Sequence, residues 1–381
     1  MKRPHPFLYI TLGFLLKIFS IIKGQKIIEK TTIQGPAILL SNHTSFYDFI
    51  YTTSAIYPKR ITYLAASKMF YETATKPFLK LARAVPKSLM QADPVASLKA
   101  FRILKKNGIV SVFPEGQISP SGKTLKPSFS IAKFLKKAAA DVYIVKHYGA
   151  GMVNPPWTKK TFKGLIETRI YKLLTKEEIL TLSLEAIYDQ VYQHLQFSPS
   201  SYLSQSPKIY KHNSIKGLEN VIYQCPVCLY EGLESSKHHL SCPSCHHEMT
   251  YDNGLLDHKG IDVWFEEQEK RLREKIDQQK DFELKGNAEL MSFRKNKLVP
   301  VGEGELHLKD DMYTYQGTVD GENKTLKFYV KSTPTLPSDI GRNVQIYEGY
   351  QIYQFELKIP WLPTKFVHAS EYLYEKSQKN G

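Results

Sequence analysis

A histidine and an aspartate five residues apart are the first side chains in this sequence that could do chemistry together. His43 and Asp48 lie in the stretch Asn-His-Thr-Ser-Phe-Tyr-Asp, directly after a predicted buried strand at 36–40. If a helix begins just after the histidine, the carboxylate can fold back onto the imidazole and fix its tautomer. The other ring nitrogen is then free to accept a proton from a hydroxyl group. By itself, this spacing is also that of an ordinary capping or surface histidine.

A second candidate group follows another predicted strand, at 109–113. The sequence Phe-Pro-Glu-Gly at 113–116 places Glu115 and Gly116 in a turn after that strand. In an open α/β sheet, ligands bind beyond the carboxyl ends of the strands. The turn can therefore bring a carboxylate and a flexible backbone to the same sheet edge as the histidine.

Together the two blocks resemble those of the glycerolipid acyltransferases, whose best-known members acylate lysophosphatidic acid. That family carries Asn-His-four residues-Asp and Phe-Pro-Glu-Gly-Thr-Arg-Ser, and the resemblance covers residues 20–200 approximately. It implies that His43 is the general base, Asp48 its orienting carboxylate, and Glu115 with Gly116 part of the acceptor site. It also implies an acyl-CoA, acyl carrier protein or acyl phosphate donor, no acylated protein, and no metal or cofactor for the chemistry.

Departures from the family pattern leave the acceptor open. Gln117 and Ile118 stand where the family has Thr and Arg, and an isoleucine cannot bind a phosphate. Lys87 is the nearest candidate for a second cation of the family, but lysine lacks the bidentate fork of arginine. The block at 142–145 lacks the proline of the family. Two further lysines could contact a phosphate or simply be solvated: Lys68 and Lys123.

All four cysteines fall into one pattern that is typical of a structural zinc site. Cys-Pro-Val-Cys at 225–228 is followed, thirteen residues later, by Cys-Pro-Ser-Cys at 242–245. Two such turns can present four thiolates to one Zn²⁺ in a tetrahedron, and a closed site of this kind supports folding rather than catalysis. The predicted ligands are Cys225, Cys228, Cys242 and Cys245. Disulfide bonds between these cysteines are the weaker alternative. The flanking histidines are expected to be exposed loop residues: His238, His239, His246 and His247.

Charge is divided unevenly along the 381 residues, whose formal net charge is +15. Residues 1–170 hold 27 Lys and Arg against 7 Asp and Glu, and residues 171–381 hold 25 against 30. An anionic partner is therefore expected for the first part. Because the cysteine-rich region is not basic, nucleic acid is not expected as a partner.

The N-terminal stretch predicts a helix that associates with a membrane. Residues 6–22 are mostly apolar, Lys17 interrupts them, and Lys23 and Lys26 follow. The charge disfavours a spanning helix, and no small-residue cleavage pattern suggests a secretory signal. A helix in the cytoplasmic membrane interface is favoured, and a soluble amphipathic helix is the alternative.

The predicted fold is an α/β sheet with flanking helices, followed by smaller modules. Within it we expect strands at 36–40, 61–65, 109–113 and 142–145, helices at 94–107 and 175–195, and a linker at 198–207. The alternation of apolar and polar residues in the tail predicts a small β-sandwich closed by a helix. The expected parts are a membrane-associating helix at 1–26, an acyltransferase domain at 27–200, a zinc-ribbon-like segment at 221–256, a charged helix at 262–284 and a β-rich domain at 298–381.

Two functions of different classes fit these observations. The first is a membrane-associated acyltransferase of phospholipid biosynthesis, with membrane lipids and an acyl donor as partners. The second is a non-catalytic lipid- or protein-binding scaffold, which the isoleucine at 118 would favour. In either case the ribbon or the β-rich tail could contact another protein.

Overall fold

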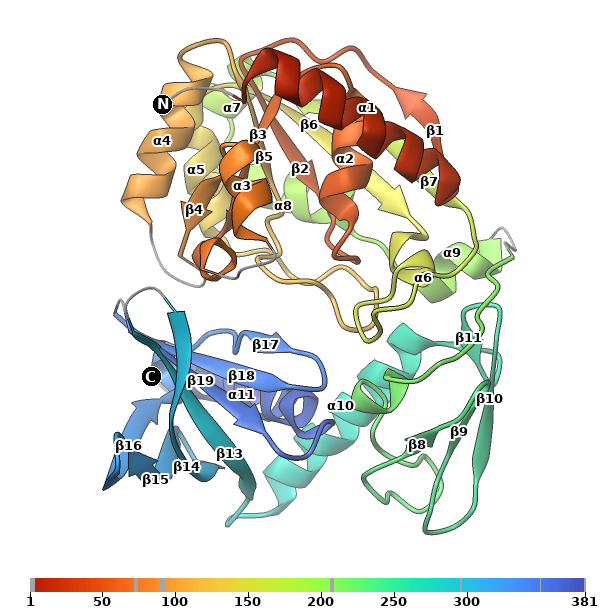
Figure 1. The fold of residues 1–381 in the computed structure, drawn as a ribbon, viewed down its shortest axis with the longest axis vertical. Coiled ribbons are helices and arrows are strands. Elements are labelled where there is room, and N and C mark those ends of the chain that lie inside the picture. Colours follow the sequence, from red (N-terminus) through yellow and green to blue (C-terminus); the bar gives the residue numbers. More distant parts are fainter. Residues whose placement is uncertain are drawn as a thin grey trace. The chain divides into compact units, whose positions relative to one another are not determined.

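The computed structural model describes residues 4–71, 75–88, 93–205, 209–294, 297–349 and 351–379. The chain divides into two compact units, Met1–His212 and Asn213–Gly381. Figure 1 shows an α/β unit at the N-terminal end of the chain and a β-rich unit at the C-terminal end. Each unit is described by itself below.

The first unit is built on a seven-stranded sheet with the order β1-β7-β6-β2-β5-β3-β4. Neighbouring strands are parallel except for the antiparallel pair β6 and β7. The strands are β1 (Gln25–Lys30), β2 (Ala37–Ser41), β3 (Ile61–Ala66), β4 (Val85–Lys87), β5 (Ile109–Val112), β6 (Asp141–Tyr148) and β7 (Ile166–Leu174). The four strands predicted from apolar runs are confirmed as β2, β3, β5 and β6.

Helices cover both faces of this sheet, and strand β2 lies buried at its centre. Ala37 and Leu39 of β2 pack on the side of α2 (Asp48–Ile56), with Tyr9 of α1 (Pro6–Ile22) at the edge of that cluster. Ile38 and Leu40 pack on the opposite side, against the helices α4 (Pro94–Leu104), α5 (Ser130–Ala138) and α8 (Leu184–Leu195). Burial on both faces explains why the sequence of β2 is a continuous apolar run and does not alternate between apolar and polar residues.

The remaining helices of this unit are short. They are η1 (Ser67–Phe70), α3 (Lys76–Leu81), α6 (Ala150–Val153), α7 (Lys176–Thr181) and α9 (Pro199–Gln205). The region predicted as one helix at 175–195 is two, α7 and α8, because Leu182 and Ser183 adopt extended backbone and Ser183 caps α8. The capping box of Thr175 and Glu178 begins α7 as expected. The prediction of a linker at 198–207 is wrong where the chain forms α9. Residues 206 and 207 lie outside the described residues.

The second unit contains two antiparallel sheets and two long helices. The smaller sheet comprises β8 (Glu234–Ser235), β9 (His239–Ser241), β10 (Glu248–Asp252), β11 (Leu255–Leu256) and β12 (Lys259–Gly260), after a single turn η2 (Leu218–Asn220). The larger sheet comprises β13 (Glu283–Arg294), β14 (Lys297–Lys309), β15 (Met312–Val319), β16 (Glu322–Tyr329), β17 (Ser338–Asp339), β18 (Asn343–Glu348) and β19 (Gln351–Leu357). The helices are α10 (Ile261–Gln278), η3 (Val330–Ser332) and α11 (Leu362–Lys379).

The tail forms one sheet where two packed sheets were expected. Its strands follow the order β16-β15-β14-β13-β19-β18-β17, and the hairpins predicted at Asp320-Gly321 and at Glu348-Gly349 join β15 to β16 and β18 to β19. The buried face of the sheet packs on Leu362 and Phe366 of α11, so a helix takes the place of the second sheet. The predicted fold class, an α/β domain followed by a cysteine cluster and a β-rich domain, is confirmed.

The N-terminal stretch, for which a membrane-associating helix is predicted, forms α1. Among the described residues, no helix combines the length and apolar character needed to cross a bilayer.

Candidate functional site

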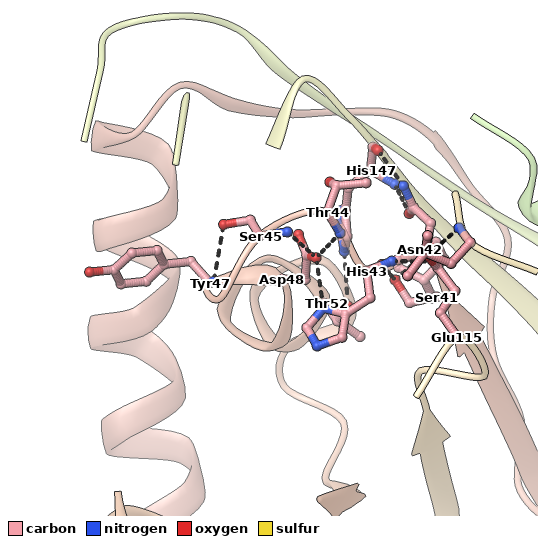
Figure 2. Close-up of polar contacts among 12 residues, drawn as sticks. Ser41, Asn42, His43, Thr44, Ser45, Tyr47, Asp48, Thr52, Glu115 and His147 are labelled. Carbon is pink, nitrogen blue, oxygen red and sulfur yellow. Dashed lines mark hydrogen bonds and ion pairs between the residues drawn. The ribbon is translucent and has the colours of Figure 1, made fainter. Parts of the chain in front are cut away.

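His43 and Asp48 are in direct contact at the carboxyl end of β2 (Figure 2). Asp48 Oδ2 lies 3.1 Å from His43 Nδ1. The aspartate is fully buried, and the histidine side chain is 19% exposed. Because a carboxylate oxygen accepts, Nδ1 carries the ring proton and Nε2 keeps a free lone pair.

The local fold holds the aspartate in place before the histidine is considered. Strand β2 ends at Ser41, and α2 begins with Asp48 in its first turn. The backbone N–H groups of Thr44 and Ser45 donate to Asp48 Oδ2 at 2.7 and 2.8 Å. One carboxylate oxygen therefore closes the strand-to-helix turn and also orients the imidazole.

Glu115 lies on the other side of the His43 main chain, as Figure 2 shows. Its Oε1 accepts from the backbone N–H of His43 at 2.7 Å, and its Oε2 accepts from the backbone N–H of Leu125 at 2.8 Å. Burial raises the pKa of Glu115 well above its usual value, and the two backbone hydrogen bonds act in the opposite direction. The next residue, Gly116, turns the chain with a φ of 78°, which a glycine adopts easily.

An aromatic side chain from the end of the neighbouring strand β5 supports the imidazole. The ring of Phe113 stacks on that of His43, with centroids 4.3 Å apart and planes 23° apart. The ring of Phe113 also stacks with that of Tyr63 of β3. The apolar contact limits how far the imidazole can turn about its side-chain bonds.

A buried polar layer beneath the dyad includes a histidine that the sequence reasoning missed. The Asn42 amide donates to the backbone carbonyl of His147 at 2.9 Å and accepts from its backbone N–H at 2.8 Å. The His147 ring lies 2.9 Å from Thr52 Oγ1 and 3.0 Å from Thr168 Oγ1. The signal in the sequence is a polar pair, Lys146 and His147, directly after the apolar run at 142–145.

The other predicted substrate-binding residue lies farther along the sheet. Lys87 ends β4, which β5 and β3 separate from β2, and its Nζ donates to the backbone carbonyl of Ser88 at 3.2 Å. Burial lowers the pKa of Lys87, and Asp93 opposes that shift. Lys68 lies in η1 and Lys123 in the loop after Gly116. The structure thus joins His43, Asp48 and Glu115 but shows no hydrogen bond from Lys87 to them.

The four cysteines come together in the second unit as one cluster that can hold a metal ion. Their sulfur atoms all lie within 4.8 Å of one another. The Sγ atoms of Cys225 and Cys245 are 3.7 Å apart, and those of Cys228 and Cys242 are 3.6 Å apart, too far for disulfide bonds of about 2.05 Å. Each pair is followed by a left-handed residue, Leu229 or His246, so the two turns match. No histidine joins this cluster in the part of the chain that the structure describes.

The neutral state of His147 makes the first unit sensitive to acid. Burial lowers the pKa of His147 to about 4, from 6.5 in a solvated chain. Between these pH values the unfolded chain binds a proton that the folded chain does not, so the free energy of unfolding decreases as the pH falls. The full loss of unfolding free energy is about 3 kcal/mol.

We expect His147→Gln to lose less stability than the unmodified protein between pH 7 and pH 4.5 in urea unfolding. Parallel losses in the two proteins would contradict this prediction, because all other titratable groups are shared.

Comparisons with known proteins bear on the first unit. Residues 21–148 match the model of the Acyltransferase family. Among solved structures, the chain is similar to the 1-acyl-sn-glycerophosphate (LPA) acyltransferase PlsC from Thermotoga maritima, with 16% identity and a TM-score of 0.41 over 50% of this chain and 78% of that chain. It is also similar to an SsgA-like sporulation-specific cell division protein from Thermobifida fusca, with 13% identity and a TM-score of 0.18 over 27% of this chain and 89% of that chain. Neither structural similarity is strong enough to bear on function.

The matched segment contains the whole of the His43 site. Strands β2 to β5 lie inside it, together with Asp48 and Glu115, and β6 ends at its last residue. The family membership predicted from the two sequence blocks is confirmed for this part of the chain. Residues 21–148 are therefore a domain of the acyltransferase family.

Proposed function

We propose that the protein transfers a fatty acyl group from an activated donor to a hydroxyl group of a glycerolipid, with His43 as general base. The observation that carries the proposal is the dyad itself: Nδ1 of His43 contacts a buried carboxylate, and the imidazole is partly exposed. This arrangement orients Nε2 toward a proton donor from outside the protein.

The reaction needs no acylated protein. Nε2 of His43 takes the proton of the acceptor hydroxyl while the oxygen attacks the acyl carbonyl carbon of the donor. When the tetrahedral intermediate collapses, the bond from that carbon to the donor's leaving group breaks, and the imidazolium returns the proton to the leaving group. Asp48 stabilises the imidazolium between these two steps.

The choice of acceptor depends on which side chain could bind a phosphate group. A 1-acylglycerol-3-phosphate is the acceptor suggested by the sequence resemblance, and its phosphate requires a cation. Ile118 cannot supply one, so Lys87 or another basic side chain of this unit would have to do so. Acyl-CoA, acyl carrier protein and acyl phosphate all remain as donors.

Replacement of the base tests the reaction. We expect His43→Ala to lower the rate of acyl transfer about 100-fold or more, because no group replaces Nε2 as the proton acceptor. The measurement supplies each labelled donor in detergent with a panel of lysophospholipids. His194→Ala is the matched control, since His194 lies on α8 across the sheet from α2 and should leave the rate unchanged.

Two outcomes would contradict the assignment in different ways. Transfer that survives in His43→Ala would remove the general-base role but leave an acyltransferase. Absence of transfer from every donor to every acceptor by the unmodified protein would favour the binding scaffold.

We also propose that α1 rests in the membrane interface. The small residues Gly13 and Ser20 face inward: a Cβ on Gly13 would lie 3.0 Å from the Tyr57 ring, and Ser20 bonds Ser54 of α2 at 2.6 Å. Nine large apolar side chains of α1 are exposed, and five of them are more than half exposed: Phe7, Phe14, Leu15, Ile21 and Ile22. An exposed apolar face of this size marks a site of membrane or protein contact.

Vesicle binding tests the role of α1. We expect the protein to co-sediment with phosphatidylcholine vesicles that contain phosphatidylglycerol, and Phe14→Glu to weaken this binding, because a charge would enter the apolar face. Leu180→Glu places the same charge on an exposed leucine of α7, on the other side of the sheet, and should bind like the unmodified protein. Equal binding of both variants would show that α1 does not contact the bilayer.

We further propose that the four cysteines hold a structural Zn²⁺. The sulfur separations of 3.6 and 3.7 Å fit a tetrahedron of thiolates, whose edges are about 3.8 Å when each Zn–S bond is about 2.3 Å. Cys225 and Cys242 are buried, and all four positions of such a site are filled by protein. The ion would support folding of the second unit and take no part in acyl transfer.

Metal analysis and chelation test the zinc site. Protein isolated without chelators should contain about one zinc ion per chain, and its removal should lower the unfolding temperature of the second unit. Cys228→Ser should show the same loss, whereas Ser235→Ala in β8 of the same small sheet should keep the metal. A chain with less than about half an equivalent of zinc would reject the site.

A further inference from the structure

The carboxylate of Glu115 faces inward. The residue is 5% exposed, and each of its oxygens accepts a backbone N–H, that of His43 at 2.7 Å and that of Leu125 at 2.8 Å. Among the described residues, no lysine or arginine forms an ion pair with it. A group that binds the acceptor would instead present an oxygen lone pair to solvent.

The main chain of His43 is held on both sides by the same loop. Its N–H donates to Glu115, and its carbonyl accepts from the backbone N–H of Ser119 at 2.9 Å. Between these two residues the chain turns at Gly116, whose N–H donates to the Phe113 carbonyl at 3.2 Å. The loop therefore forms a frame around the residue that carries the imidazole.

The two oxygens of Glu115 join elements that are distant in sequence. His43 follows β2, whereas Leu125 lies in the loop between β5 and α5. That loop is fixed at its far side, because the backbone N–H of Thr124 donates to the Phe197 carbonyl at 3.0 Å, after α8. The carboxylate thus connects the histidine to an anchored part of the fold.

We propose that Glu115 is a positioning residue: it holds the His43 main chain against the anchored loop and does not bind the acceptor. The inference rests on the proposed function for its kinetic consequence and differs from the acceptor-binding role that the sequence resemblance implies. A displacement of the imidazole by about 1 Å can lower the rate of a reaction about 100-fold. The effect of losing Glu115 should therefore be on kcat.

The kinetic test separates the two roles of the glutamate. Glu115→Gln keeps the shape, but its NH₂ group cannot accept the second backbone N–H. We expect kcat to fall about 10- to 100-fold while the KM for the acceptor changes less than about threefold. A rise in that KM with kcat unchanged would overturn the proposal in favour of acceptor binding.

Matched variants guard against a simple loss of folding. Glu178→Gln removes a carboxylate that accepts the Thr175 backbone N–H at 2.7 Å in the same unit, and it should keep both kinetic constants. Glu115→Asp retains the carboxyl group but is one methylene shorter, so it cannot reach both amides and should lose kcat as the glutamine variant does. An aspartate variant with full kcat would overturn the proposal.

A second measurement is independent of activity. Hydrogen exchange, followed on peptides that contain His43 and Leu125, should be faster in Glu115→Gln than in the unmodified protein at equal global stability. Unchanged exchange at both amides would overturn the proposal. If the unmodified protein transfers no acyl group, the proposed function fails, whereas the exchange result still decides whether Glu115 holds the loop.

Discussion

The site depends on one carboxylate oxygen, Oδ2 of Asp48. It accepts two backbone N–H groups of the turn after β2 and contacts the imidazole of His43. The backbone bonds hold the oxygen in place whether or not a substrate is present, so the orientation of the ring is set during folding. A buried acceptor with such partners is costly to move, because each abandoned N–H would lose its bond in a water-poor region.

The sheet brings the remaining parts of the site to this oxygen. Parallel neighbours β2 and β5 end at the same edge, so the turn after β5 delivers Phe113 and Glu115 to the loop of His43. Phe113 contacts the imidazole ring, and Glu115 accepts a hydrogen bond from the main chain of His43. The dyad and the Pro-Glu-Gly turn thus act as one structure, although Phe113 follows Asp48 by 65 positions in the sequence. Figure 2 shows Glu115 of this turn beside His43.

Sequence patterns predicted those parts of the fold whose cause is local. The apolar strands β2, β3, β5 and β6 and the capping box of Thr175 each follow from neighbouring residues. The contact of His43 with Asp48 likewise follows from their spacing at a strand end. The single sheet of the tail could not be predicted, because whether a β face packs on a second sheet or on α11 is decided by long-range contacts. His147 and the inward-facing carboxylate of Glu115 were missed for the same reason, since their partners lie on other strands and loops.

The buried acids also change the meaning of the uneven charge. Residues 1–170 carry 7 acidic residues against 27 basic ones, and two of the seven, Asp48 and Glu115, are buried in the site. Both accept backbone N–H groups, and neither forms an ion pair with a lysine or arginine among the described residues. The lysines and arginines of this unit are therefore opposed at its surface by fewer acids than the composition states. An anionic substrate or surface would therefore meet side chains that are mostly basic.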